Sequence, residues 1–494
     1  MSSPAIATTP PLPAPAKPRR RRWLRVMLVV LALAILGPLT FYAYSEYASR
    51  RALEDAEAAA AMDLPRWRLA ELQEDRKKFA DHENSALHII AVARKGKGVY
   101  VSGVPKYNEI FDNLPPTAQL NDQQMRIIRG ELDKIVEPLV EARKLKDMPG
   151  GRFPITISDD FIATLIPDHQ SARQLGDWLS FDARLRSQDE EYAEAIDSCR
   201  ACLNAGRAAA DDPFVITLLI RIAIGEVAIE SLERVVAQAA DTGDVTYDAA
   251  LKEMQSLLEL EAKECNLATT IRGERAGYSH LFENIRSGKI KPAFLRTMGI
   301  GGNDGTLNPI SAWWLNNVPT ALLKYYPEYL QHMNAVVEAA KLPRSERASK
   351  LGELEMARVK SGNLVMQLLS PYVSKVSQTE TRHQVRLRAG AAGMASERYR
   401  LKHGNWPASL EALVKEGWLA EVPVDPLDDQ PMRFRVTPEG IVIYSIGFDR
   451  QDNGGIINLN RMQEADVDIG FRLWSPAMRR QAPRPVVAVD DLKN

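Results

Sequence analysis

Residues 389–455 read AGAAGMASERYRLKHGNWPASLEALVKEGWLAEVPVDPLDDQPMRFRVTPEGIVIYSIGFDRQDNGG, and they decide how the C-terminal part of the chain folds. The stretch 378–403 contains no proline and is rich in alanine and arginine, which favours a helix. Gly404 follows where a helix ends on a left-handed residue. Residues 409–414 (SLEALV) then predict a second, short helix with apolar side chains on one face.

The next segment changes to a strand-like pattern. Residues 422–426 (VPVDP) exclude a helix and a central strand, because proline lacks the amide donor. Residues 432–436 and 441–445 alternate or run β-branched around a Pro-Glu-Gly turn, which predicts a β-hairpin. An acidic loop that ends in glycine follows at residues 448–455. We therefore expect a small α+β fold over residues 377–475.

The same order of elements resembles the globular domain of the major pseudopilin of bacterial type II secretion. The matching segments are 397–401 (ERYRL), 404–410 (GNWPASL), 413–414 (LV), 423–426 (PVDP), 444–449 (YSIGFD), 454–455 (GG) and 466–470 (DVDIG). The resemblance implies a pseudopilin-like α+β domain with calcium bound in its acidic loop. The chain as a whole also resembles large single-anchor envelope proteins of planctomycete-like bacteria, which says little about activity.

The composition is that of a folded globular protein. The chain has 494 residues, of which 45% are hydrophobic and 26% charged, as in ordinary folded domains. Its length suggests roughly two or three domains with an ample core. The net charge is −1, so no overall field draws the protein to nucleic acid, and we expect no nucleic-acid partner. Three cysteines are too few for a disulfide framework.

Near the N-terminus, a cluster of arginines precedes a long apolar run. Residues 19–22 are arginines, and residues 26–44 carry no charged side chain. A helix that crosses a bilayer needs ~20 apolar residues, so we expect a transmembrane helix over residues 23–44. Residues 1–22 are expected to be a disordered, basic cytoplasmic tail. Residues 45–64, which are charged and rich in alanine, are expected to form a helical stalk.

The arginines predict the orientation of this segment. They hold the N-terminus in the cytoplasm, so we expect a single-pass protein of the inner (cytoplasmic) membrane whose bulk is periplasmic. Trp23 at one end, and Tyr42, Tyr44 and Tyr47 at the other, fit the aromatic belts of a span. The alternative is a cleaved signal peptide, with residues 43–45 (AYS) as the cleavage motif. The length of the apolar run and of the leader before it favours the anchor.

Residues 65–376 predict a large helical extracytoplasmic domain. Residues 175–188 and 190–208 form a predicted helical hairpin that loosely resembles a tetratricopeptide unit, with Ala193 and Ala195 as small packing residues. The sequence shows no second clean copy, and a solenoid needs about three units, so a solenoid is not established.

The most apolar stretch after the N-terminal run is residues 214–236, which contain Arg221 and Glu226. Two charges in mid-helix cost ~2.5–3.5 kcal/mol each in lipid. We therefore expect a buried core helix here rather than a second membrane span. At the other end of the chain, residues 476–494 are rich in proline and polar residues, and we expect a loose tail.

Cys199 and Cys202 form the Cys-x-x-Cys motif of the chain. Redox motifs of this kind usually begin a helix, where the helix dipole lowers the thiol pKa. Here the motif lies inside a predicted helix, after Tyr192, Ala195 and Ile196. Buried packing is therefore the favoured interpretation, and a disulfide or a redox role is the alternative.

The acidic C-terminal loop is the candidate metal site. Its predicted ligands are Asp449, Asp452, Asp466 and Asp468. Calcium takes 6–8 oxygen ligands from carboxylates and backbone carbonyls, and a glycine-rich turn helps carbonyls to converge. The pseudopilin resemblance points to the same loop. The alternative is a solvated acidic loop without a metal.

Two functions of different classes follow from these observations. The first is a membrane-anchored extracytoplasmic binding or structural protein, with a protein partner in the envelope and a link to secretion or envelope assembly. The second is an envelope hydrolase or redox enzyme whose site leaves no recognisable motif. A deep pocket with convergent polar groups and shifted pKa values would favour the enzyme. A groove along stacked helices would favour binding.

Overall fold

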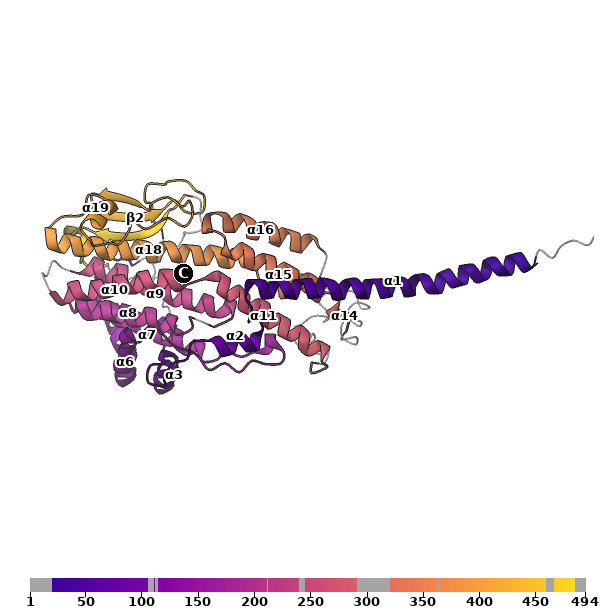
Figure 1. Ribbon diagram of the computed structural model, residues 1–494. Coiled ribbons are helices and arrows are strands. Elements are labelled where there is room, and N and C mark those ends of the chain that lie inside the picture. The colour runs from indigo at the N-terminus through magenta and orange to yellow at the C-terminus, as the bar shows by residue number, and fades with distance from the viewer. Residues whose placement is uncertain are drawn as a thin grey trace, which may run out of the picture.

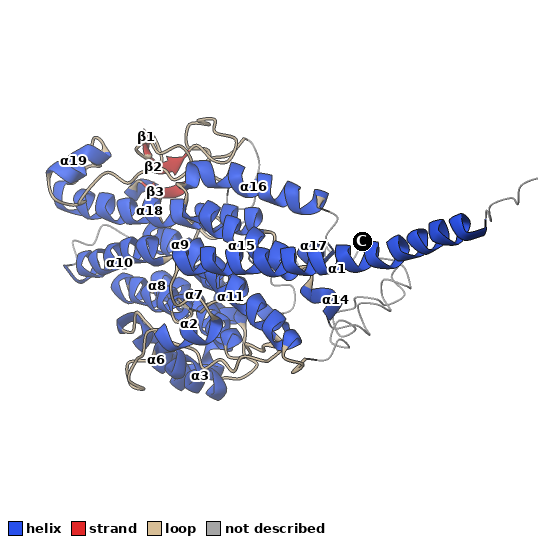
Figure 2. Cartoon of the chain, turned by 45° about the vertical axis from the view of Figure 1, so that its right-hand side comes forward, coloured by secondary structure: helices blue, strands red, loops and turns tan. Residues whose placement is uncertain are grey.

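The described part of the chain is mainly helical, as predicted, and carries one small sheet (Figure 1). The computed structural model describes residues 20–104, 111, 114–210, 212–239, 245–290, 320–361, 364–458 and 466–484. Figure 2 shows helices stacked side by side, with the sheet on one side of the stack and one helix projecting from it. Nearly all of the predicted cytoplasmic tail lies outside the described residues.

The elements follow one another along the chain with short connections. The α-helices are α1 (Arg20–Asp63), α2 (Leu69–Asp75), α3 (Ser85–Lys95), α5 (Asp122–Leu132), α6 (Val136–Arg143), α7 (His169–Gln188), α8 (Tyr192–Arg207), α9 (Val215–Gln238), α10 (Val245–Glu264), α11 (Leu267–Arg286), α14 (Thr320–Leu323), α15 (Tyr326–Lys341), α16 (Arg344–Lys360), α17 (Leu364–Leu369), α18 (Val373–His403) and α19 (Leu410–Lys415). Five 3₁₀ turns are η1 (Val101–Gly103), η2 (Asp133–Ile135), η3 (Lys144–Asp147), η4 (Phe161–Ala163) and η5 (Pro476–Met478). The strands are β1 (Arg433–Thr437), β2 (Gly440–Ser445) and β3 (Ile469–Trp474).

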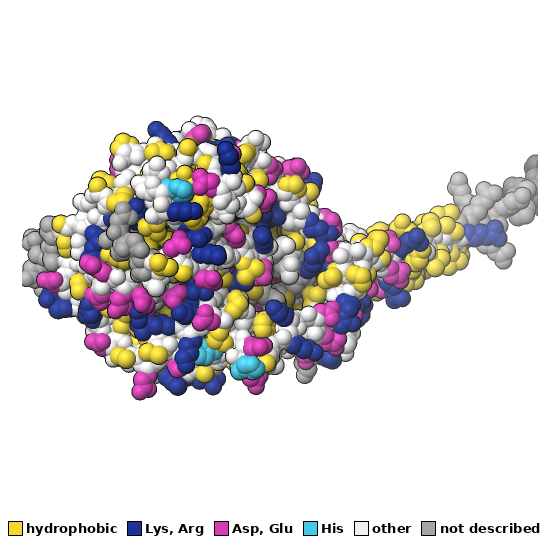
Figure 3. All heavy atoms as spheres, turned by 60° about the vertical axis from the view of Figure 1, so that its left-hand side comes forward, with side chains coloured by type: hydrophobic (Ala, Val, Ile, Leu, Met, Phe, Trp, Pro, Cys, Tyr) yellow, Lys and Arg dark blue, Asp and Glu magenta, His cyan; other side chains and the backbone are white. Residues whose placement is uncertain are grey.

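Helix α1 is the one described helix that is long and apolar enough to cross a membrane. The predicted span and the predicted stalk are parts of this one helix, which runs without interruption to Asp63. Its side chains are exposed over residues 23–44. Figure 3 shows that hydrophobic side chains cover this projecting part, whereas acidic and basic side chains are mixed over the body.

The last turns of α1 pack on the body. Ala56 and Ala60 are buried, and α1 lies against α15. The side-chain amide of Asn334 donates to the backbone oxygen of Ala56 at 2.8 Å. The small alanine side chains allow this close approach of the two helices.

Asp63 fixes the end of α1 to two further helices. Its buried carboxylate accepts from Arg272 at 2.6 and 3.0 Å and from Arg275 at 3.0 Å, and it lies 2.7 Å from the ammonium of Lys341. Burial raises the pKa of Asp63, but the three cations outweigh it and hold the pKa below its usual value. The projecting helix is therefore attached to α11 and α15 by charge as well as by packing.

The predicted helical hairpin is formed by α7 and α8. α7 begins earlier than predicted, at His169, and the pair packs against α9. Gly206 allows this approach, because a Cβ there would lie 3.0 Å from the backbone oxygen of Arg221. The likeness of this hairpin to a tetratricopeptide unit stays a prediction.

Helix α9 confirms the prediction of a buried core helix. Its charged residues Arg221 and Glu226 are paired within the protein. Arg221 donates to Glu261 on α10 at 2.7 Å. Glu226 accepts from Arg386 on α18 at 2.7 Å and lies 2.6 Å from the ring nitrogen Nδ1 of His383. Pairing of this kind lowers the free energy of charges that burial would otherwise destabilise.

The C-terminal segment confirms the predicted helix, short helix and hairpin. Gly404 ends α18 with a φ of 76°, in the left-handed region. The sheet has the order β1-β2-β3, with all neighbours antiparallel, and Phe434 and Phe471 both pair in register with Ile443. Sequence reasoning had not predicted β3, because its pairing with β2 joins segments separated by a long loop.

Helix α18 lies between this sheet and the helical body (Figure 1). Gly393 makes room for the sheet, since a Cβ there would lie 2.9 Å from the ring of Phe471. The opposite side of α18 packs on α9, α10 and α16. The expected domain boundary at residues 376 and 377 falls inside α18, and the buried apolar core is continuous across it.

The tail that was expected to be loose is bound to the body in its first part. Buried Arg479 donates to Glu397 on α18 through two nitrogen–oxygen contacts of 2.8 Å. Glu397 also accepts from Arg400 at 2.9 Å. The backbone N–H of Gln481 donates to the carbonyl of Thr117 at 2.8 Å. Residues 485–494 lie outside the described part of the chain.

We predict that Glu397→Ala destabilises the protein by about 3–5 kcal/mol, because it leaves two arginines buried without their carboxylate. Thermal unfolding of the detergent-solubilised protein measures the effect. The matched control is Glu353→Ala, which removes an exposed ion pair with Lys350 at 2.9 Å and should cost less than about 1 kcal/mol. Equal losses in the two variants would contradict the role of the buried pair.

Glu233 on α9 gives a second prediction, because it is buried with little compensation. Burial raises its pKa to about 7, although Arg386 and Arg472 lower it; the charge on Glu230 adds to the rise. Its oxygen Oε2 lies 3.8 Å from Arg386. The folded state therefore favours the protonated form. Stability from this group is complete below the ordinary glutamate pKa and is lost as the pH rises through about 7.

Between pH 5 and 8, the loss from Glu233 should reach at most about 3 kcal/mol, and Glu233→Gln should remove it. Buried Glu274, whose pKa burial also raises to about 7, should keep part of the slope. Denaturant titrations across this pH range measure the change. The control is Glu230→Gln, one turn away on an exposed side chain, which should leave the slope as it is; a flat wild-type profile would refute the prediction.

Candidate functional site

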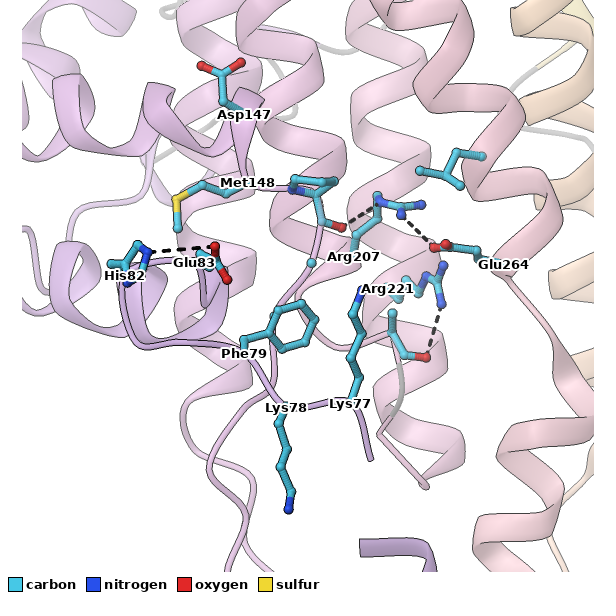
Figure 4. Close-up of a pocket in the computed structure, with 15 residues that line it drawn as sticks. Lys77, Lys78, Phe79, His82, Glu83, Asp147, Met148, Arg207, Arg221 and Glu264 are labelled. Carbon is cyan, nitrogen blue, oxygen red and sulfur yellow. Dashed lines mark hydrogen bonds and ion pairs between the residues drawn. The ribbon is translucent and has the colours of Figure 1, made fainter. Parts of the chain in front are cut away.

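A cleft of about 740 Å³ opens between α8, α9, α10 and two loops (Figure 4). One loop follows α2 and carries Lys77, Lys78 and Phe79; the other follows η3 and carries Met148 and Pro149. The volume lies within the range of small-molecule sites, about 300–1,000 Å³. The cleft is therefore the candidate binding site of the described chain.

Two buried arginines and a glutamate form the floor. Arg207 at the end of α8 donates from Nη1 to Glu261 at 2.6 Å. Arg221 donates to the same carboxylate from Nε and Nη2, both at 2.7 Å. Arg207 and Arg221 also donate to the carbonyls of Pro149, at 3.2 Å, and Ala210, at 3.3 Å. These bonds hold both guanidinium groups in place.

The floor is charged, and its charges are fixed. Burial lowers the pKa of Arg221, but the carboxylate of Glu261 outweighs it and raises the pKa above its usual value. Burial raises the pKa of Glu261, but Arg221 and Arg207 outweigh it and lower the pKa. Two cations share one fully buried anion. A second carboxylate, Glu264, accepts from Arg207 at 2.6 Å but is 46% exposed.

The rim adds a lysine and an aromatic ring. In Figure 4 the side chain of Lys77 extends toward the floor, whereas that of Lys78 points away. The ammonium of Lys77 lies 4.9 Å from the centre of the Phe79 ring. Met148, Pro149 and Leu260 provide apolar wall. The cleft thus combines a cationic floor with apolar sides.

The loop after η3 is held firmly, which keeps the cleft open. The backbone N–H of Ser85 donates to Gly150 at 3.2 Å, and that of Arg152 donates to the side chain of Asn84 at 2.9 Å. Gly151 is required at this point, because a Cβ would lie 2.4 Å from the hydroxyl of Ser85. The loop therefore lies tightly against the start of α3.

The cysteine pair lies inside α8, away from the cleft lining. Cys199 and Cys202 are both buried and both free thiols. Burial raises the pKa of each thiol, to about 12 for Cys202. Cys202 donates weakly to the carbonyl of Gly176 on α7 at 3.5 Å. This is the packing role that the sequence favoured, since a buried thiol with a raised pKa is a poor nucleophile.

The acidic loop brings three of its four predicted ligands into electrostatic contact. Burial raises the pKa of Asp468, and the charges of Asp452 and Asp449 raise it further, against hydrogen bonds from Gly455 and Asn453. The fourth predicted ligand, Asp466, is exposed and follows residues 459–465, which lie outside the described chain.

The carboxylates of this loop already accept hydrogen bonds. Asp449 accepts from the N–H of Gln451 at 3.1 Å. Asp452 accepts from the hydroxyl of Tyr444 at 3.0 Å and from the N–H of Gly454 at 2.8 Å. Asp468 accepts from Gly455 at 2.7 Å. In the part of the chain that is described, no three acidic, histidine or cysteine side chains are arranged as a metal site, so calcium stays a prediction.

Sequence reasoning missed the cleft. It noted Arg221 as a charge within an apolar helix but did not single out Lys77, Arg207, Glu261 or Glu264. The available signal was of the same kind in each helix: Arg207 and Glu261 are charged residues on otherwise apolar faces. Their partners are far apart in sequence, so the pattern could indicate buried pairs without showing which residues pair.

Comparison with known proteins adds no relative to this description. No family model matches the chain, and neither a curated protein nor a solved structure is detectably similar to it.

Proposed function

We propose that this chain is a single-pass protein of the inner membrane with a cytoplasmic N-terminus and an extracytoplasmic binding or structural body. The observation that carries the proposal is α1. Its first half is apolar and fully exposed, and its second half is packed and ion-paired in the body. An apolar surface of this length is unfavourable in water and suits the bilayer core.

The continuity of α1 supports a scaffold that holds the body near the membrane. From Tyr44, at the far end of the predicted span, to Ala56, where the packed part begins, the helix should rise about 18 Å at 1.5 Å per residue. The body would therefore stand at a short, fixed distance from the bilayer rather than on a flexible linker.

The cleft supports binding better than catalysis. Arg207 and Arg221 are held in ion pairs with Glu261, and the pKa of Arg221 is raised, so it stays charged. Groups of this kind orient a ligand by charge and hydrogen bonds. General acid–base catalysis instead needs a group whose pKa lies near the working pH.

The pseudopilin-like segment supports a protein partner in the envelope, linked to a secretion system or to envelope assembly. Its support is the order of elements: a long helix capped by Gly404, a short helix, an antiparallel hairpin and an acidic loop. The edge strand β1 exposes Val436 and Arg435, and an exposed strand edge is one mode of partner recognition.

The topology is tested directly in cells. A reporter fused after Asn494 should be active outside the cytoplasm, and the full protein should stay in the membrane after a carbonate wash. A variant that begins at residue 46 and is exported by an unrelated cleavable signal should be soluble, because it lacks the apolar half of α1. Recovery of the wild type as a soluble protein with a new N-terminus near Glu46 would instead show a signal peptide.

Calcium in the acidic loop is part of the proposal, with one observation in its support. The pKa of buried Asp468 is raised by burial and by the nearby charges of Asp452 and Asp449. A bound cation would offset both effects and stabilise the ionised carboxylates. The hydrogen bonds that these oxygens already accept would have to rearrange for calcium to bind.

Millimolar calcium should therefore raise the melting temperature of the solubilised protein, and chelator should reverse the shift. Binding to the native state stabilises by ~2.7 kcal/mol at a hundredfold excess over the dissociation constant. Asp449→Ala should remove most of the gain, whereas Glu439→Ala, in the exposed hairpin turn, should retain it. Magnesium should do less. A melting temperature that ignores calcium would leave a solvated acidic turn.

A further inference from the structure

We propose that the cleft binds an oxyanion, a carboxylate or phosphate group carried by a partly apolar molecule. The inference rests on the proposed binding role of the body and names the ligand class. It is carried by the arrangement of Arg207, Arg221 and Glu261 at the floor, with Glu264 at the edge and Lys77 on the rim (Figure 4).

The floor holds a surplus of positive charge. Arg207 and Arg221 are almost completely buried, and the carboxylate between them, Glu261, is fully buried. One buried anion between two buried cations leaves one positive charge, which is costly in a low-dielectric site. A further negative charge at this position is therefore favourable.

Glu264 now offsets that surplus, but it is the weaker partner. Its carboxylate is 46% exposed, whereas that of Glu261 is 0% exposed. An exposed carboxylate gains little from an ion pair, because water and salt screen it. A ligand oxyanion can take the place of Glu264 beside Arg207 while Glu261 keeps both arginines in position.

The arginines have hydrogen-bond capacity left for such a ligand. A guanidinium group has five N–H donors. Arg207 donates to Pro149, Glu261 and Glu264, and Arg221 donates through three nitrogens to Glu261 and Ala210. Among the described residues, three of five donors are thus used on each arginine. Planar forks of this kind match carboxylate and phosphate oxygens.

The walls indicate that the anion has an apolar part. Phe79 and Met148 lie over the floor from opposite loops, and Figure 4 shows the Phe79 ring turned into the cleft. Lys77 reaches inward beside the ring. A volume of about 740 Å³ holds far more than an inorganic ion, so an oxyanion at the floor would leave room for an apolar body along these walls.

Calorimetric titration of the full-length protein in neutral detergent tests the proposal with three probes: inorganic phosphate, hexanoate and neutral hexanamide. Hexanoate or phosphate should bind, more weakly as chloride rises, and hexanamide should not. Tighter binding of hexanoate assigns a carboxylate on an apolar body, and binding of phosphate alone assigns a phosphate group.

Three substitutions of exposed residues locate the site without disturbing the buried pairs. Lys77→Gln should weaken binding about fivefold, and Glu264→Gln, which removes the competing carboxylate, should tighten it by a similar factor. Lys78→Gln is the matched control, because this neighbouring lysine points away from the cleft, and it should change nothing.

Several results would overturn the oxyanion site. They are no heat with either anion, equal binding of hexanamide, or the same loss for Lys77→Gln and Lys78→Gln. A protein that stays in the membrane yet binds neither anion would refute this inference alone. A protein that binds hexanoate but is released by carbonate would refute the anchor and leave the cleft assignment standing.

Discussion

The fold depends on neutralising carboxylates that are buried between helices. Four of them pair with cations from other segments of the chain. The sets are Glu226 with His383 and Arg386, Glu261 with Arg207 and Arg221, Glu380 with Arg344 and Arg347, and Glu397 with Arg400 and Arg479. Together they tie α8, α9, α10, α16, α18 and the C-terminal segment. Removal of one partner would leave a buried charge, so each pair restricts how these helices can pack.

This constraint also explains why the cleft has a charged floor. Apolar residues of similar volume are often as stabilising as a buried ion pair, so stability alone does not require arginine at positions 207 and 221. The pair around Glu261 does something that apolar packing cannot do. It holds two guanidinium groups at the base of a cleft, with their charge fixed and their planes oriented by five hydrogen bonds to Glu261, Pro149 and Ala210.

The sequence predicted what local patterns determine. The helix that ends at Gly404, the hairpin of β1 and β2, and the buried helix α9 each follow from neighbouring residues. β3 and the attachment of Arg479 depend on partners far along the chain, so periodicity could not reveal them. The cleft is the extreme case, because its floor joins residues of three helices and its rim comes from a loop. The acidic loop was found by composition, but composition could not show that its carboxylates accept hydrogen bonds from their own turn.

The rim of the cleft is connected to the membrane helix by a short and well-fixed path. After Asp63, the chain passes through buried Trp67, whose ring lies 5.6 Å from the guanidinium of Arg275, and enters α2. Arg76, next to Lys77, is buried in an ion pair with Asp212, and Asp212 also lies 2.5 Å from His169. The segment between the anchor and Lys77 is thus fixed at both ends. Motion of α1 relative to the body would shift this loop against the floor, so the anchor and the cleft form one mechanical unit.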